Sequence, residues 1–318
     1  MKSPYTNILV TGGCGFVGSN LVNYLLNKYE NVRIINIDKL DYCADVNNVD
    51  HGDSHGDRYI LMPGSLCDLN FVYNILTIYE VDIVLHLAAQ SHVQNSFGNS
   101  LQFTQDNIVG THCLLEASKK YAKLKKFVYM STDEVHGSST LKSEETFNPT
   151  NPYAATKAAC ELLVGSYSKS FKLPSLIIRS NNIFGPRQHT EKLIPRFISQ
   201  LQNGEKCPVQ GCGGQMRTFV YVEDVCDAID LVAHKGEINE IYEIGSHDEY
   251  TVLDIAKILV KKILNRDDYK ELLTFVEDRD FNDFRYEVNA EKLIELGWKQ
   301  KHSFEEGMNK TIDWYIRK

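Results

Sequence analysis

The 318-residue chain has no Cys-x-x-Cys pair, no long basic run and no apolar run long enough to span a bilayer. Cys14, Cys113 and Cys160 fall within apolar patterns where a small thiol serves as packing, so we expect reduced cysteines and no metal site. A net charge of −8 without a basic stretch argues against nucleic-acid or anionic-membrane partners. The first ten residues do not read as a signal peptide. We expect a cytoplasmic protein with no nucleic acid and no membrane among its partners.

Short β-branched runs alternate with amphipathic helical stretches from residue 7 to residue 179. The runs are 8–10, 32–37, 59–62, 83–87, 127–130 and 176–178. Repeated strand–helix units of this kind predict an α/β fold, a Rossmann-type doubly wound parallel sheet covered on both faces.

The rhythm changes after Arg179, where prolines and the 211–214 turn interrupt it. We expect residues 1–180 plus about 216–246 to form one domain built on the main sheet, and about 181–215 plus 247–318 to form a smaller α/β domain. Runs 217–221 and 241–245 read as strands that could return to the main sheet. Stretches 251–264 and 303–315 read as helices, the second with Ser303 and Glu306 at capping-box spacing.

A glycine-rich turn follows the first predicted strand. Gly12, Gly15 and Gly18 suit a tight turn, a close backbone approach to pyrophosphate and helix-on-strand packing. Asp38 ends the second strand twenty residues after Gly18, where a carboxylate can accept from both ribose hydroxyls. The alternative is a plain glycine turn with a solvated aspartate. Asp38 favours NAD over NADP, because it would repel a 2′-phosphate that only Lys39 is near enough to offset.

Two further segments carry candidate chemistry. Tyr153 and Lys157 lie four apart on one predicted helical face, where an ammonium can stabilise a phenolate, although a surface tyrosine with an extended lysine would look the same. Thr132, Asp133 and Glu134 follow the fifth strand, at the sheet edge where ligands bind in such folds. Solvated loop carboxylates are the alternative there. An acid beside a base is what elimination next to a ketone requires.

The chain resembles the extended short-chain dehydrogenase/reductase superfamily and, within it, the nucleoside-diphosphate-glucose 4,6-dehydratases. The segments that carry the resemblance are 11–18, 38–42, 86–93, 107–111, 131–135, 151–153, 181–186, 191–195 and 278–279. Sister 4-epimerases share the glycines and the Tyr/Lys pair but have small or neutral residues at Asp133 and Glu134. These two carboxylates therefore favour a dehydratase over a 4-epimerase, or over an inactive NAD-binding scaffold or sensor.

The resemblance implies a lyase that uses NAD to oxidise carbon 4 of the sugar, removes water across carbons 5 and 6 and returns the hydride to carbon 6. Tyr153, poised by Lys157 and helped by Thr132, would take the 4-hydroxyl proton. Glu134 would take the carbon 5 proton, and protonated Asp133 would protonate the leaving 6-hydroxyl. The product would be a 4-keto-6-deoxy sugar, as in rhamnose-type deoxysugar biosynthesis.

The resemblance also implies the remaining contacts and a homodimer formed by helical stretches 107–121 and 154–171. Implied cofactor contacts are Gly12, Gly15, Phe16, Val17, Gly18, Asp38, Lys39, Leu66, Ala88, Ala89, Tyr153 and Lys157. Implied substrate contacts are Ser91, His92, Thr132, Asn182, Lys192, Leu193, Arg217, Arg279 and Asn282. The two arginines would bind the pyrophosphate, because a planar guanidinium fork matches phosphate oxygens.

Several positions depart from the bacterial dTDP-glucose enzymes. Ser65 replaces their adenine-end aspartate, leaving Asp68 three residues later, and Glu243 replaces an asparagine. His136 follows the catalytic acids where they have tyrosine, and we interpret it as a packed aromatic substitute. Segments 38–43, 96–100 and 281–283 resemble the dehydratase part of plant UDP-rhamnose synthases, which favours UDP-glucose, with dTDP-glucose still open.

Overall fold

The computed structural model describes residues 1–50, 56–137, 146–246, 249–278 and 289–317. Its main feature is a seven-stranded sheet of order β10-β6-β5-β4-β1-β2-β3 in which every neighbouring pair is parallel. The strands are β1 (Asn7–Thr11), β2 (Arg33–Asp38), β3 (Tyr59–Pro63), β4 (Ile83–His86), β5 (Lys126–Met130), β6 (Ser175–Ser180) and β10 (Ile241–Ile244). The predicted Rossmann-type sheet is confirmed. The strand order reverses between β1 and β4, which is where such sheets bind ligands.

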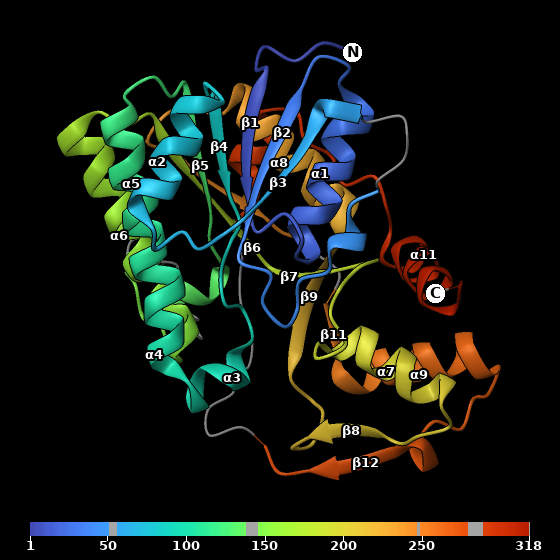
Figure 1. Cartoon of the computed structure of the whole chain (residues 1–318). Helices are drawn as coiled ribbons and strands as arrows, with labels where there is room; N and C mark the ends of the chain where they lie inside the picture. Colours follow the sequence, from blue (N-terminus) through green and yellow to red (C-terminus); the bar gives the residue numbers. More distant parts are fainter. Residues whose placement is uncertain (51–55, 138–145, 247–248, 279–288, 318) are drawn as a thin grey trace.

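Helices cover both faces of this sheet (Figure 1). The α-helices of the described residues are α1 (Phe16–Lys28), α2 (Leu69–Ile78), α3 (Val93–Gly98), α4 (Ser100–Phe103), α5 (Gly110–Tyr121), α6 (Pro152–Phe171), α7 (Leu193–Gln202), α8 (Val222–Lys235), α9 (Val252–Leu264), α10 (Glu291–Glu295) and α11 (Phe304–Arg317). Those on the main sheet include α1 and α8 on one face and α2, α5 and α6 on the other. Along β1, Ile8 and Val10 pack into the layer of α1 and α8, whereas Leu9 packs into that of α2, α5 and α6. This alternation follows from the two-residue period of a strand whose two faces are both buried.

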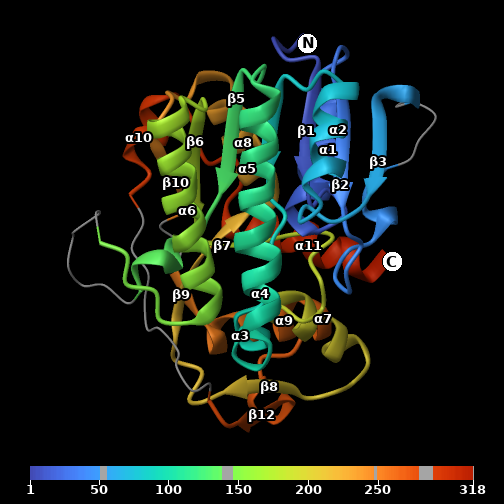
Figure 2. The same cartoon turned by 60° about the vertical axis from the view of Figure 1, so that its left-hand side comes forward.

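A π-helical turn, Thr104–Val109, joins α4 to α5. The three form one long rod beside α6 (Figure 2). Asn107 within the turn is buried: its side chain accepts the N–H of Gln90 (2.7 Å) and donates to the carbonyl of Gln90 (3.1 Å) and to Thr156 Oγ1 (2.9 Å). The turn thereby ties the loop after β4 to the helix that carries Tyr153.

The smaller part of the molecule is built on two short sheets, with α7 and α9 beside them (Figure 1). One has the order β11-β9-β7 and the other pairs β12 with β8. Their strands are β7 (Asn182–Phe184), β8 (Cys207–Gln210), β9 (Met216–Tyr221), β11 (Glu249–Thr251) and β12 (Leu273–Val276). Of the two strands predicted to return to the main sheet, only β10 does so. β10 occupies the free edge of β6, so β9 pairs instead with β7 and β11.

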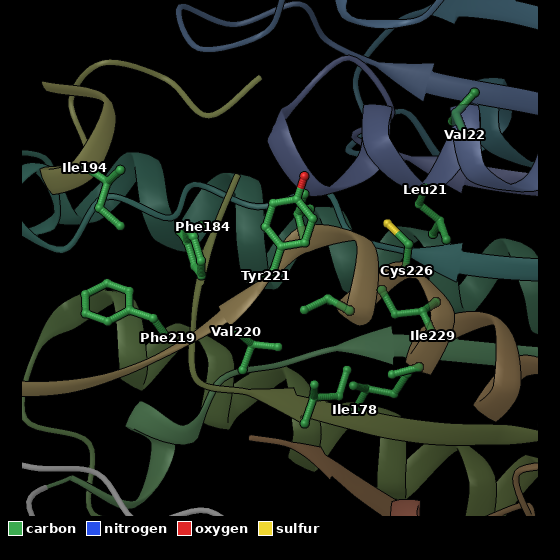
Figure 3. Close-up of a cluster of buried hydrophobic side chains, with 14 of the residues drawn as sticks. Leu21, Val22, Ile178, Phe184, Ile194, Phe219, Val220, Tyr221, Cys226 and Ile229 are labelled. Carbon is green, nitrogen blue, oxygen red and sulfur yellow. The ribbon is translucent and has the colours of Figure 1, made fainter. Parts of the chain in front are cut away.

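An aromatic and aliphatic cluster joins the two parts (Figure 3). Phe184 and Phe219 of the small sheet pack with Leu21 of α1 and Ile229 of α8 in one continuous buried core. Phe304, at the start of α11, adds its ring 5.1 Å from that of Phe184. The capping box predicted for this helix is present: Ser303 Oγ accepts the N–H of Glu306 (3.3 Å), and Glu306 Oε2 accepts the N–H of Ser303 (2.8 Å). The shared core holds the second unit against the carboxyl edge of the main sheet.

Across the described ranges, we find no helix with the length and apolar character needed to cross a membrane. All eight cysteines lie within these ranges and all are free thiols.

Candidate active site

A pocket of about 830 Å³ runs from the β1/β4 switch point to the small sheets. All the predicted site residues that the structure describes line it, from the glycine turn to Arg217. Arg279 and Asn282 lie outside the described residues. Residues more than two hundred positions apart thus meet in one cavity.

The glycine turn begins where β1 ends. Gly12 has a φ of +72°, and a Cβ built on it would lie 2.8 Å from the Cα of Ala88. A Cβ on Gly18 would lie 2.1 Å from the carbonyl oxygen of Gly12, so the first turn of α1 could not close on the loop. At Gly15 the same atom meets only that carbonyl, at 3.3 Å. Neighbouring protein atoms therefore leave no space for a side chain at Gly12 or Gly18, whereas Gly15 is less crowded and lines the pocket.

Asp38 is 7% exposed at the end of β2. Its Oδ2 accepts the N–H of Cys14 (2.9 Å), and its Oδ1 accepts the N–H of Leu40 (2.8 Å). A carboxylate has about four acceptor sites, so capacity for two ribose hydroxyls remains.

Lys39 belongs to a charged network that the sequence did not reveal. Its Nζ lies 2.7 Å from Asp41 Oδ2 and 2.6 Å from Asp106 Oδ2. Gln90 Nε2 donates to the same two aspartates, at 2.7 and 3.0 Å. The network joins the loop after β2 to the π-helical turn, and all four residues line the pocket.

The two carboxylates predicted to be catalytic occupy different surroundings in the 3₁₀ turn Asp133–His136, which follows β5 after two residues. Asp133 is 6% exposed, and burial, followed by the charge of Glu134, raises its pKa to about 7. Thr132 Oγ1 donates to its Oδ1 (3.0 Å) and Asn181 Nδ2 to its Oδ2 (2.6 Å). Glu134 is half-buried and accepts from Asn151 Nδ2 at 3.0 Å. Burial and charge thus favour a proton on Asp133, as expected for an acid beside a base.

Tyr153 stands in the first turn of α6. Burial and the charges of Glu134 and Asp133 raise its pKa, while a hydrogen bond from Thr132 acts in the opposite direction. Burial lowers the pKa of Lys157 to about 8. The Nζ of Lys157 donates to the carbonyl of Met130 at 2.7 Å, and no hydrogen bond joins these two described residues, Tyr153 and Lys157, to each other.

The predicted substrate residues lie on the opposite wall. Lys192 Nζ donates to the carbonyl of Ser91 at 2.8 Å, which joins the start of α7 to the loop after β4. His92 Nδ1 lies 3.8 Å from Glu191 Oε2, which also accepts from the Tyr42 hydroxyl (2.8 Å). The loops after β2, after β4 and before α7 are thereby joined around the pocket.

Arg217, on β9, also lines this cavity. Its positive charge acts to lower the pKa of Asp133, but burial and Glu134 have the larger effect and raise that pKa overall. Asn182 and Leu193 line the same region, Asn182 as an exposed side chain. Its neighbour Asn181 is 5% exposed and contacts Asp133 directly. The sequence motif singled out Asn182. Asn181 lies between β6 and β7 and is the buried one of the two, whereas Asn182 begins β7 and is exposed.

The structure shows what surrounds the positions that depart from the bacterial pattern. Asp68 Oδ1 accepts the N–H of Phe71 (3.0 Å) as the N-cap of α2, and Asp68 does not line the pocket, whereas Ser65 does. His136 stacks on Phe147 with ring centroids 6.3 Å apart, as a packed aromatic. Glu243 Oε1 accepts a hydrogen bond from the NH1 group of buried Arg179 at 3.4 Å.

The residues that sequence reasoning missed are chiefly amides and charges that act on other residues. They include Asp41, Gln90, Asp106, Asn151, Asn181 and Glu191. Asn151 and Asn181 are within the motifs noted in the sequence, but only tertiary structure shows which carboxylate each one contacts.

The sheet order, glycine turn and Tyr153/Lys157 pair define a Rossmann protein of the short-chain dehydrogenase/reductase type. The chain belongs to the family of GDP-mannose 4,6 dehydratase, whose model matches residues 9–311.

Three relatives show how far the similarity extends. The dTDP-D-glucose 4,6-dehydratase of Dictyostelium discoideum is 42% identical over 97% of this chain and 81% of its own length. A trifunctional UDP-glucose 4,6-dehydratase, epimerase and reductase of Arabidopsis thaliana is also 42% identical; the chain spans about half of it, 47%. A crystal structure of dTDP-glucose 4,6-dehydratase from Streptomyces venezuelae, with NAD bound, superposes with a TM-score of 0.92 at 35% identity, covering 98% and 97% of the two chains.

Proposed function

We propose that this protein is an NAD-dependent nucleoside-diphosphate-glucose 4,6-dehydratase, a hydro-lyase that yields a 4-keto-6-deoxy sugar. The observation that carries the proposal is the pairing of Asp133, whose pKa is raised to about 7, with Glu134, in one pocket with Tyr153. An epimerase needs only a group for the 4-hydroxyl proton, whereas elimination also needs an acid and a base. The relatives named as dehydratases support the same reading.

The residues present fit NAD. The cradle leaves no space for a side chain at Gly12 and Gly18, and it lines the pocket beside the N-terminus of α1, which favours a pyrophosphate. Asp38 would hold the adenine ribose, and Phe16, Val17, Leu66, Ala88 and Ala89 would line the rest of the cofactor site. When bound, NAD accepts a hydride from carbon 4 and later supplies it to carbon 6.

The protein groups divide the proton transfers. Tyr153, as a phenolate stabilised by the Lys157 ammonium and with Thr132 beside it, would take the proton of the 4-hydroxyl, and the resulting ketone acidifies the carbon 5 hydrogen. Glu134 removes that proton as the carbon 6–oxygen bond breaks, and Asp133 protonates the departing hydroxyl so that it leaves as water. Carbon 5 regains a proton when carbon 6 is reduced. Each acid–base step contributes roughly 10²–10⁴ in rate.

Lys192, Arg196 and Arg217 are described cations that line the pocket, and we assign Arg217 to the pyrophosphate. Arg279 and Asn282 remain part of the proposal on the strength of the sequence. The proposed substrate is UDP-glucose, with dTDP-glucose as the alternative, because one methyl group on the base changes binding by only about 1–3 kcal/mol.

Turnover of UDP-glucose in heavy water tests the reaction class. A dehydratase gives a product that has lost water and carries deuterium at carbon 5. A mass-neutral sugar without deuterium would instead establish a 4-epimerase, and bound NAD without any turnover would indicate a scaffold or sensor.

The nucleotide is tested separately by assaying UDP-glucose and dTDP-glucose in parallel, with products identified by NMR. We expect a higher kcat/KM for UDP-glucose. Equal values would remove the preference for uracil and leave the dehydratase assignment intact.

Three further parts of the proposal concern the setting of the enzyme. We propose a homodimer through α5 and α6, because Leu162 on α6 is 61% exposed. We propose a cytoplasmic location, which eight free thiols favour. We propose the division into a cofactor domain (1–180 plus about 216–246) and a nucleotide-sugar domain (about 181–215 plus 247–318), except that β9 (Met216–Tyr221) pairs with β7 and β11 and is moved to the nucleotide-sugar domain.

A further inference from the structure

Asn151 is a buried residue, 7% exposed, located between the two catalytic segments. It precedes α6 with extended backbone angles (φ −140°, ψ 160°), and its Oδ1 accepts the N–H of Ala154 at 2.9 Å. It is therefore the N-cap of the helix that carries Tyr153 and Lys157. Pro152, whose ring fixes φ, occupies the first turn and makes this start rigid.

The other arm of the same amide contacts the proposed base. Asn151 Nδ2 donates to Glu134 Oε2 at 3.0 Å. The orientation of the amide is settled by its partners, because only the oxygen can accept from a backbone N–H and only the nitrogen can donate to a carboxylate. One side chain thus connects the 3₁₀ turn after β5 with the N-terminus of α6.

This connection matters for the geometry of the reaction. Tyr153 acts at the oxygen on carbon 4, and Glu134 acts at the neighbouring carbon 5, so their relative placement has to match one sugar ring. A misplacement of about 1 Å can cost 10²-fold in rate. A hydrogen bond to a carboxylate also stabilises its charged form. Glu134 needs that charge to act as a base, and its neighbour Asp133 needs the proton.

We propose that Asn151 is a positioning residue for the elimination step: it caps α6 and, with the same amide, holds Glu134 in register with Tyr153 for removal of the carbon 5 proton. This inference rests on the proposed dehydratase function and deepens it. A helix cap alone could be supplied by serine, threonine or aspartate; only an amide supplies both the cap and an N–H for Glu134.

Substitutions that retain the cap separate the two roles. Asn151→Ser keeps a capping oxygen but loses the Nδ2 donor to Glu134, because its one O–H lies on the shorter, capping side of the residue. Asn151→Asp keeps the cap and places a second carboxylate against Glu134. Asn151→Ala removes both functions. Ser303→Asn, at the cap of α11 outside the pocket, is the matched exchange of one capping residue for another.

The experiment compares these variants with the wild-type holoenzyme on UDP-glucose and dTDP-glucose. For Asn151→Ser we expect kcat for dehydration to fall roughly 10- to 100-fold with KM within threefold, the usual scale for losing a hydrogen bond to a charged group. The melting temperature and bound NAD should stay near wild type. The rise in absorbance at 340 nm on adding substrate should persist, because oxidation at carbon 4 does not use Glu134. Asn151→Asp should lose more activity, and Ser303→Asn none.

A dehydration rate for Asn151→Ser equal to wild type, with only Asn151→Ala impaired and less stable, would overturn the inference and leave a cap alone. A parallel loss of the 340 nm signal and of dehydration would also overturn it, since the defect would then not be specific to elimination. If the wild-type enzyme removes no water from either substrate, the proposed function itself fails, which the wild-type assay shows independently of any variant.

Discussion

The two ends of the pocket are built in different ways. At the cofactor end, consecutive strand–helix units place the functional groups through sheet register: Thr11 pairs with His86, which sets Gly12 against Ala88. At the substrate end, the groups come from separate segments joined by side chains, such as Lys192 and Ser91, which are 101 residues apart. Backbone pairing within the main sheet therefore builds the predicted cofactor end, whereas side-chain contacts between separate segments build the predicted substrate end.

Glu134→Gln should separate the two ends most strongly. The amide cannot remove the carbon 5 proton, so we expect dehydration to fall by about 10²–10⁴. The content of bound NAD should not change, because Glu134 lies away from the glycine turn. Product formation by NMR and NAD released on denaturation are the two measurements. Loss of NAD in this variant would show that the ends are not independent.

Asp38→Asn probes the cofactor end. The neutral amide weakens the hydrogen bonds from the ribose, so affinity for NAD should fall roughly 10- to 100-fold. Calorimetric titration of cofactor-free protein measures this, with Asp57→Asn as the exposed control. Saturating NAD should restore most of the turnover. A low kcat even at saturation would contradict a role confined to cofactor binding.

The pH profile of kcat/KM examines the substrate end. The pKa of Asp133 is raised to about 7 by burial and by Glu134, and the protonated form is the active acid, so kcat/KM should fall as pH rises through about 7. Asn181→Ala removes a donor that stabilises the carboxylate, and should move this limb upward by roughly one pH unit. Asn182→Ala should leave the limb where it is. An unmoved limb in Asn181→Ala would assign the titration to another group.

The smallest effect is expected at a site outside the pocket. Burial acts to lower the pKa of His234, but hydrogen bonds and charge from Asp230 raise it overall. Its protonated form therefore stabilises the fold below the unfolded pKa, and that contribution is lost as pH rises through the higher folded value. His234→Gln should lower stability by about 1 kcal/mol at pH 5.5, little at pH 9, and leave turnover unchanged. Thermal unfolding at both pH values checks this; equal losses would contradict the charge argument.

The same contrast explains what the sequence could predict. The main sheet, the glycine turn and Asp38 were predictable because each depends on periodicity or on spacing within one or two units. The pairing of β9 with β7 was not, since it depends on β10 occupying the edge of β6. Asn151 and Asn181 were also missed as site residues, because an amide near a carboxylate has no sequence signature until the fold brings them together.

The most direct test of the central claim follows one hydrogen atom. Nucleoside-diphosphate-glucose deuterated at carbon 4 would be converted by the wild-type enzyme and the product examined by NMR. If one active site oxidises carbon 4, removes water and returns the hydride, the deuterium appears in the carbon 6 methyl group. Deuterium retained at carbon 4 of a product that has not lost water would contradict the account and establish epimerisation instead.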